Sequence, residues 1–175
     1  DYAREMQASS VVSAAESLAA SATLTFAEPF GNIAGPDFAV FENSFNDNFL
    51  ELAFVEVSSD GIRFVRFPAT SLTPADEQVG GNGSLDPTCL NNLAGKYRVG
   101  YGTPFDLDEL RDSAGLDITR ITHVRVVDVV GTIDPQYATR DAKGRIVNDP
   151  WPTRDTVWAS GGFDLTGVAV LRAAK

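Results

Sequence analysis

Acidic and amide side chains gather in two stretches of the chain, and their types and spacing point to calcium chemistry. Calcium takes about six to eight hard oxygen ligands, which loops supply from carboxylates, amide oxygens and backbone carbonyls. Neither stretch has the spacing of an EF-hand, so solvated loop acids and turn formers are the alternative interpretation. The first group is Asp37, Glu42, Asn43, Asp47 and Asn48, which Asp164 could join, and the second is Asp128, Asp134, Asp141 and Asp149.

Aromatic residues in or beside the long loops offer a second kind of chemistry. A flat ring stacks on a sugar while neighbouring acids and amides hydrogen-bond the sugar hydroxyls. The alternative is that the tryptophans anchor a loop, since Trp151 stands between two prolines. The candidate ligand-binding residues are Tyr97, Tyr101, Tyr137, Trp151 and Trp158.

Catalytic motifs are scarce. His123 is the only histidine, and it lies in a run of Val and Ile with no partner motif, which favours a core or sheet-surface role over a general base. The chain has no nucleophile elbow, zinc-protease motif, P-loop or dinucleotide fingerprint. A glycosidase needs only two carboxylates, so a carboxylate-based hydrolase remains an alternative to a non-enzymatic protein.

Charge and composition exclude several classes of partner. The formal net charge of −10 repels nucleic-acid phosphates and anionic membrane surfaces, and it attracts cations. Cys89 is the single cysteine, so an internal disulfide and a four-cysteine metal cage are excluded, and a half-buried free thiol is expected. No apolar run approaches the roughly 20 residues of a membrane span. The first residues lack a signal sequence, which indicates a cytosolic protein or a processed, exported one.

Strands must position these side chains. Alternating or doubly apolar patterns predict them over 21–26, 37–43, 51–58, 62–67, 118–130 and 163–171. Asp60-Gly61 predicts a tight hairpin, because Gly supplies the positive φ such a turn needs. A short helix is predicted over 106–110, with Asp106 as N-cap and Glu109 completing a capping box.

The remaining segments carry no sustained strand period. Long loops are expected over 68–104 and 134–162, and residues 1–20 form either a helix or an extended segment. The whole chain, 1–175, is therefore expected to be one all-β domain, a jelly-roll-like β-sandwich with long loops and one short helix.

Six ordered blocks of the sequence, at 35–43, 53–67, 93–97, 102–106, 123–128 and 161–165, carry a family resemblance. Together they resemble a family of bacterial cell-surface proteins whose members often carry a C-terminal PEP-CTERM sorting tail and have no assigned activity. More weakly, the same blocks are similar to galactose-binding-like jelly rolls. That likeness implies a structural calcium ion and sugar binding, without saying which residues bind.

Three functional hypotheses follow. The first is an extracellular or cell-surface, calcium-stabilised module that binds carbohydrate or another surface ligand such as a surface protein. The second is a structural subunit of an extracellular filament or coat, in which copies of the chain associate through sheet edges. The third is the carboxylate-based hydrolase.

Overall fold

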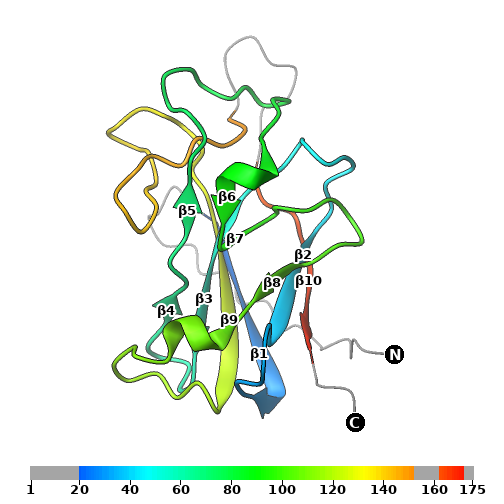
Figure 1. Cartoon of the computed structure of the whole chain (residues 1–175), viewed down its shortest axis with the longest axis vertical. Helices are drawn as coiled ribbons and strands as arrows, with labels where there is room; N and C mark the ends of the chain where they lie inside the picture. Colours follow the sequence, from blue (N-terminus) through cyan, green and yellow to red (C-terminus); the bar gives the residue numbers. More distant parts are fainter. Residues whose placement is uncertain (1–19, 152–161, 172–175) are drawn as a thin grey trace.

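The computed structural model describes residues 20–151 and 162–171, which form two main antiparallel sheets packed face to face and a third, two-stranded sheet (Figure 1). The predicted all-β sandwich is confirmed. The larger sheet has the order β1 (Ser21–Phe30), β9 (Ile121–Asp128), β3 (Ala53–Ser58), β4 (Val65–Arg66), with β7 (Leu93–Ala94) also on β3. The smaller sheet has the order β10 (Leu165–Val170), β2 (Phe38–Glu42), β8 (Thr103–Phe105), and β5 (Thr70–Ser71) pairs with β6 (Leu90–Asn91).

Phenylalanine side chains fill the space between the two sheets. Phe38 of β2 stacks on Phe105 of β8 at 5.4 Å between ring centroids, and Phe67 packs against both rings. Every residue of β3 is buried, because this central strand is covered on both faces. A second buried cluster includes Leu50, Leu52 and Phe54, and it lies under the long loops.

The predicted hairpin after β3 is only partly correct. Gly61 has the expected positive φ, +76°. The returning strand is shorter than predicted, because only Val65 and Arg66 pair with β3. The physical reason is Asp60, whose Oδ1 accepts hydrogen bonds from the backbone N–H groups of Ile62 and Arg63. This side-chain turn occupies the donors that an immediate strand would have used.

The predicted helix is a 3-10 helix, η2, over Leu107–Leu110. Asp106 is its N-cap and accepts from Asp108 N, as predicted. The capping box is wrong, because Glu109 Oε2 instead accepts a hydrogen bond from Asn92 Nδ2 at 2.6 Å. A second 3-10 helix, η1, spans Pro87–Cys89.

Short elements interrupt the predicted loop over 68–104. Strands β5, β6 and β7 and the helix η1 lie within it, and β8 begins at its end, at Thr103; each of these elements has at most three residues. Runs this short have no detectable period. The alternatives for residues 1–20 fall almost wholly outside the described residues. Cys89 is a half-buried free thiol, as expected, and among the described residues no helix has the length and apolarity to cross a membrane.

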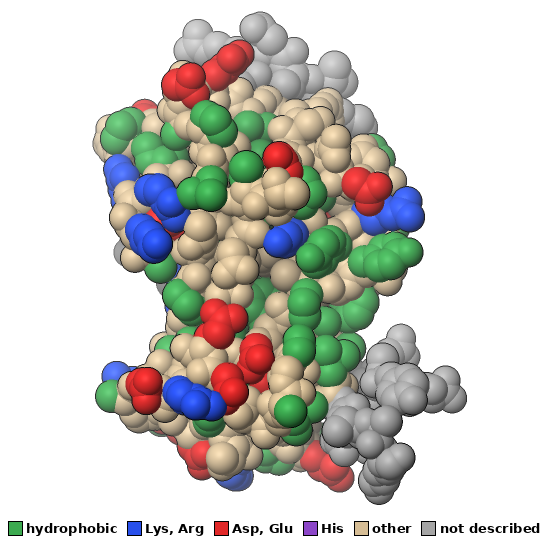
Figure 2. Space-filling model, viewed as in Figure 1, with side chains coloured by type: hydrophobic (Ala, Val, Ile, Leu, Met, Phe, Trp, Pro, Cys, Tyr) green, Lys and Arg blue, Asp and Glu red, His purple; other side chains and the backbone are tan. Residues whose placement is uncertain are grey.

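The long loops gather at one end of the sandwich, at the top of Figure 1. Strands β2 and β9 end there, at Glu42 and Asp128, and β3 and β10 begin there. On the face drawn in Figure 2, acidic, basic and hydrophobic side chains are interspersed, without one large apolar patch. The functional candidates therefore depend on particular residues at this loop-rich end.

Candidate functional sites

Five carboxylates lie at the loop-rich end, on or beside strands β2, β3, β9 and β10 and in the loop that follows β9; we call them the carboxylate cluster. Glu42, Glu51 and Asp149 are buried, with exposed fractions of 1%, 8% and 1%. Asp128 is half-buried, and Asp164 lies at the exposed rim. Four of them were predicted calcium ligands, drawn from both sequence groups, and the tertiary structure brings them to the same end of the sandwich.

The segment that leads into β10 joins two of these carboxylates. Glu51 Oε1 accepts from Gly162 N at 2.9 Å, and Asp128 Oδ1 accepts from Phe163 N at 2.8 Å. Gly162 has φ +154°, and a Cβ there would lie 2.9 Å from Asp128 Oδ2. A glycine is therefore required for the backbone to approach the carboxylate this closely. Asp164 follows directly, and Asn43 Nδ2 donates to its Oδ2 at 3.1 Å.

Glu42 and Asp149 each have one satisfied and one unsatisfied oxygen. Ser44 N donates to Glu42 Oε2 at 2.6 Å, and Leu52 N donates to Asp149 Oδ2 at 3.2 Å. Glu42 Oε1 and Asp149 Oδ1 are buried and have no hydrogen-bond partner among the described residues. A buried polar atom without a partner costs about 1–3 kcal/mol, and more if it is charged.

The pKa values reflect burial and mutual repulsion. Burial, with the charges of Glu51 and Asp164, raises the pKa of Glu42 to about 7. Burial, followed by the charges of Asp128, Glu51 and Glu42, raises the pKa of Asp149 well above its ordinary value. The pKa values of Glu51 and Asp128 are raised for the same two reasons. Within the described ranges, no Lys or Arg forms an ion pair with these groups.

The other predicted metal ligands lie elsewhere. Asp37 is at the opposite end of β2 from Glu42, and its two oxygens accept from Ile33 N and Leu107 N. Asp47 pairs with Arg98 on the surface. Asp134 is exposed and closes a local turn by accepting from Gln136 N.

Asp141 is buried, but it forms an ion pair with Arg145. Arg145 Nε donates to Asp141 Oδ2 at 2.8 Å, and the N–H groups of Ser71, Lys143 and Arg145 donate to its two oxygens. Although burial acts to raise the pKa of Asp141, these hydrogen bonds outweigh it and lower the pKa. Asp141 therefore has no need of a metal ion.

Glu51 was missed from the sequence. It stands just before β3 in a run that also holds Glu56, and both are charged residues among apolar ones. Glu56 forms ion pairs with Arg66 and Arg125 across the sheet, whereas Glu51 has no such partner among the described residues. A glutamate in an otherwise apolar run was the available signal in the sequence. That signal does not distinguish a glutamate paired with arginine, such as Glu56, from one beside other carboxylates, such as Glu51.

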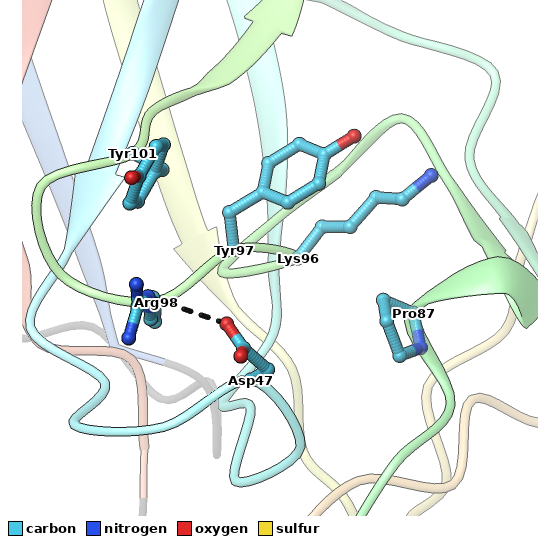
Figure 3. A pocket seen from close by; sticks show the side chains of 6 residues that line it. All are labelled: Asp47, Pro87, Lys96, Tyr97, Arg98 and Tyr101. Atoms are coloured by element: carbon cyan, nitrogen blue, oxygen red, sulfur yellow. Dashed lines mark ion pairs between the residues drawn. The ribbon is translucent and has the colours of Figure 1, made fainter.

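A surface pocket of about 320 Å³ lies on the loop that follows β7. We call it the tyrosine pocket; its lining residues are Asp47, Pro87, Lys96, Tyr97, Arg98 and Tyr101 (Figure 3). Tyr97 and Tyr101 are 40% and 60% exposed. Lys96 Nζ lies 5.7 Å from the Tyr97 ring centroid, and the Arg98 guanidinium lies 5.5 Å from that of Tyr101.

A backbone hydrogen bond and an ion pair hold this loop against the loop that follows β2. Val99 N donates to Ser44 O at 2.7 Å, and Arg98 Nε pairs with Asp47 Oδ1 at 3.3 Å. Phe45, Val99 and the two tyrosines are exposed, so four of the large exposed hydrophobic side chains sit on two adjoining loops. Such a group marks a candidate contact surface.

The structure separates the predicted aromatic ligand contacts. Tyr101 lines the pocket, and so does Tyr97. Tyr137 is exposed on another loop, outside the pocket. Trp151 is half-buried, and its backbone N–H donates to Val79 O at 3.1 Å. Trp158 lies outside the described residues. His123 lies on β9, where its Nδ1 is 2.8 Å from Thr122 Oγ1.

The carboxylate cluster offers only oxygen donors, which suit a hard cation. In the part of the chain that the structure describes, no three His, Cys, Asp or Glu side chains already converge as a ready-made metal site. Like-charged carboxylates repel one another, so side chains without a cation between them are expected to stand apart.

No protein-family model, no curated protein and no solved structure matches this chain.

Proposed function

We propose that this protein is a non-enzymatic, extracellular or cell-surface module that binds carbohydrate in the tyrosine pocket. The observation that supports this function is the pair of exposed rings, Tyr97 and Tyr101, beside the polar side chains of one open pocket. The features of a sugar site are all on this loop surface: flat apolar faces, hydrogen-bonding groups and open access.

The two tyrosines supply the apolar part of such a site. A pyranose ring presents C–H groups on its faces, and these pack on an aromatic ring while the hydroxyls point sideways. Tyr97 and Tyr101 both border the pocket in Figure 3. Their loop is short and is held by the Val99–Ser44 hydrogen bond, so little conformational entropy is lost when a ligand binds.

Charged side chains supply the polar part. Asp47 and Arg98 form an exposed ion pair, with side chains 76% and 47% exposed, so further oxygens and N–H groups remain open to a ligand. A carboxylate and a guanidinium side by side can accept from and donate to neighbouring sugar hydroxyls. Lys96 adds a cation beside the Tyr97 ring.

The same residues favour binding over hydrolysis. A glycosidase places two carboxyl groups across the scissile bond. Of the residues that line the pocket, Asp47 is the only acid. The three most buried members of the carboxylate cluster are shielded from solvent, which disfavours contact with a polymeric substrate.

A glycan array, followed by calorimetric titration of the best oligosaccharide, tests the proposal. We expect Tyr97→Ala and Tyr101→Ala each to weaken binding by about tenfold, because each removes a stacking contact of about 1–1.5 kcal/mol. Tyr137→Ala is the matched control, since Tyr137 is equally exposed but lies outside the pocket.

Tyr137→Ala should leave the affinity for the oligosaccharide unchanged. An array with no bound glycan, or an affinity that survives the loss of both pocket tyrosines, would rule the proposal out.

A further inference from the structure

We propose that the carboxylate cluster binds one calcium ion, which ties the two sheets together at their loop-rich end. The ligands come from Glu42, Glu51, Asp128 and Asp149, with Asp164 at the rim. This inference is independent of the carbohydrate proposal, because the cluster and the tyrosine pocket share no residue.

The first argument is the pair of unsatisfied oxygens. Glu42 and Asp149 are each 99% buried, and each keeps one oxygen with no hydrogen-bond partner among the described residues. Native proteins pair nearly all buried polar atoms, so an exception needs an explanation. Two such atoms within one group of mutually repelling carboxylates are explained together by a cation.

The second argument is the contrast with the other buried acids. Glu56 is 6% exposed, and both of its oxygens receive an arginine, at 2.8 Å from Arg66 and 2.6 Å from Arg125. Asp141 likewise receives Arg145. This protein thus neutralises buried carboxylates elsewhere with its own side chains. The cluster concentrates more negative charge, yet within the described ranges it has no basic partner.

The third argument concerns which cation fits. Zinc prefers nitrogen and sulfur ligands, and the cluster contains neither. The only histidine, His123, lies on β9 five residues before Asp128, and the only cysteine, Cys89, lies in η1. Magnesium demands a small octahedral shell and usually keeps several waters. Calcium accepts several carboxylates together with carbonyl oxygens in an irregular shell. An all-oxygen, multiply acidic and largely buried site therefore fits calcium best.

The backbone already brings the ligands to one place. Glu51 and Asp128 accept from consecutive residues, Gly162 and Phe163, and Asp149 accepts from Leu52, next to Glu51. Glu42 lies opposite Leu165, next to Asp164, in the β2–β10 ladder. We expect calcium to draw the side chains together, because it replaces carboxylate repulsion with attraction.

Calorimetric titration of the chelator-treated protein with calcium chloride at pH 7.5 is the primary test. We expect one ion per chain, and a weaker response to magnesium at the same concentration. Thermal unfolding in calcium should occur at least about 5 °C above that in EGTA, because an ion that binds only the folded state stabilises it.

Amide variants locate the site. Glu42→Gln and Asp149→Asn keep shape and hydrogen-bond acceptors but remove a charge, so we expect calcium binding to fall by at least about tenfold. In EGTA both variants should melt at or above the wild-type temperature, since a repelling charge is gone. Asp134→Asn is the matched control: it removes one exposed acid and keeps its local turn, so calcium binding should be unchanged.

Two results would overturn the proposal. One is a wild-type protein with no binding heat and the same melting temperature in calcium and in EGTA. The other is calcium binding that survives both amide substitutions, or that is lost in Asp134→Asn. Neither result affects the carbohydrate titration of the pocket variants, so the two proposals fail separately.

Discussion

Asp141 and Asp149 lie eight residues apart in one loop, and both are buried, yet their environments are opposite. Asp141 receives Arg145 and three backbone N–H groups, and its pKa is lowered although burial acts to raise it. Asp149 receives one N–H group, faces other carboxylates, and has its pKa raised by burial first and by those charges second. Burial by itself therefore does not decide how a carboxylate behaves.

The same contrast holds between two strand glutamates. Glu56 is neutralised by Arg66 and Arg125, whereas Glu42 keeps an oxygen with no partner among the described residues. A buried carboxylate must be neutralised by a basic side chain of the protein, by a proton or by a bound cation. Arginine thus neutralises Glu56 and Asp141 within the fold, whereas no Lys or Arg among the described residues pairs with the acids of the cluster.

The largest effect is expected from removing the internal cation of Asp141. Arg145→Ala leaves a buried carboxylate with only its backbone N–H donors, so the free energy of unfolding should fall by about 3 kcal/mol, the low end for a broken buried pair because Arg145 is 37% exposed. Urea denaturation measures this loss. Arg140→Ala is the control in the same loop, because Arg140 is exposed and donates only to Gly144 O; it should cost less than about 1 kcal/mol. Equal losses in both variants would remove the distinction between the two kinds of buried acid.

A smaller effect is expected from pH on the cluster. The pKa of Glu42 is about 7 in the folded protein against an ordinary 4.5, so between these pH values the folded state binds more protons than the unfolded chain. By linkage, stability in EGTA should therefore fall as pH rises from 4.5 through 7, by at most about 3 kcal/mol from Glu42.

Urea titrations at several pH values measure this slope. Glu42→Gln should flatten it, whereas Asp134→Asn should leave it in place. A stability in EGTA that instead rises over this window would show that the cluster is not strained by its own charge.

The smallest effect is expected in the coupling of the two sites. Ser44 links them, since its N–H donates to Glu42 Oε2 and its carbonyl accepts from Val99 N of the pocket loop. If both proposals hold, calcium should strengthen carbohydrate binding by about threefold, roughly 0.6 kcal/mol. Titration of the oligosaccharide in calcium and in EGTA measures this ratio. A ratio of one would mean that calcium binding does not change the affinity for the oligosaccharide.

The period of the apolar residues predicted the main strands well, because the alternation in β1 follows from burial on one face, and the apolar residues on both faces of β3 and β9 follow from cover on both. The extent of the hairpin and the capping box were wrong, because Asp60 and Glu109 found other hydrogen-bond partners. Strands of two or three residues between 70 and 105 had no period from which to predict them.

The sequence by itself determined that the chain forms a sandwich and that its loops carry an excess of oxygen donors, because strand periodicity and composition are local properties. Only the tertiary structure decided which acids meet. Glu42, Glu51, Asp128, Asp149 and Asp164 are up to 122 positions apart (164 − 42), and strand pairing and loop return bring them together. Cross-strand register likewise decides that Glu56 receives two arginines, because it lies opposite both Arg66 and Arg125.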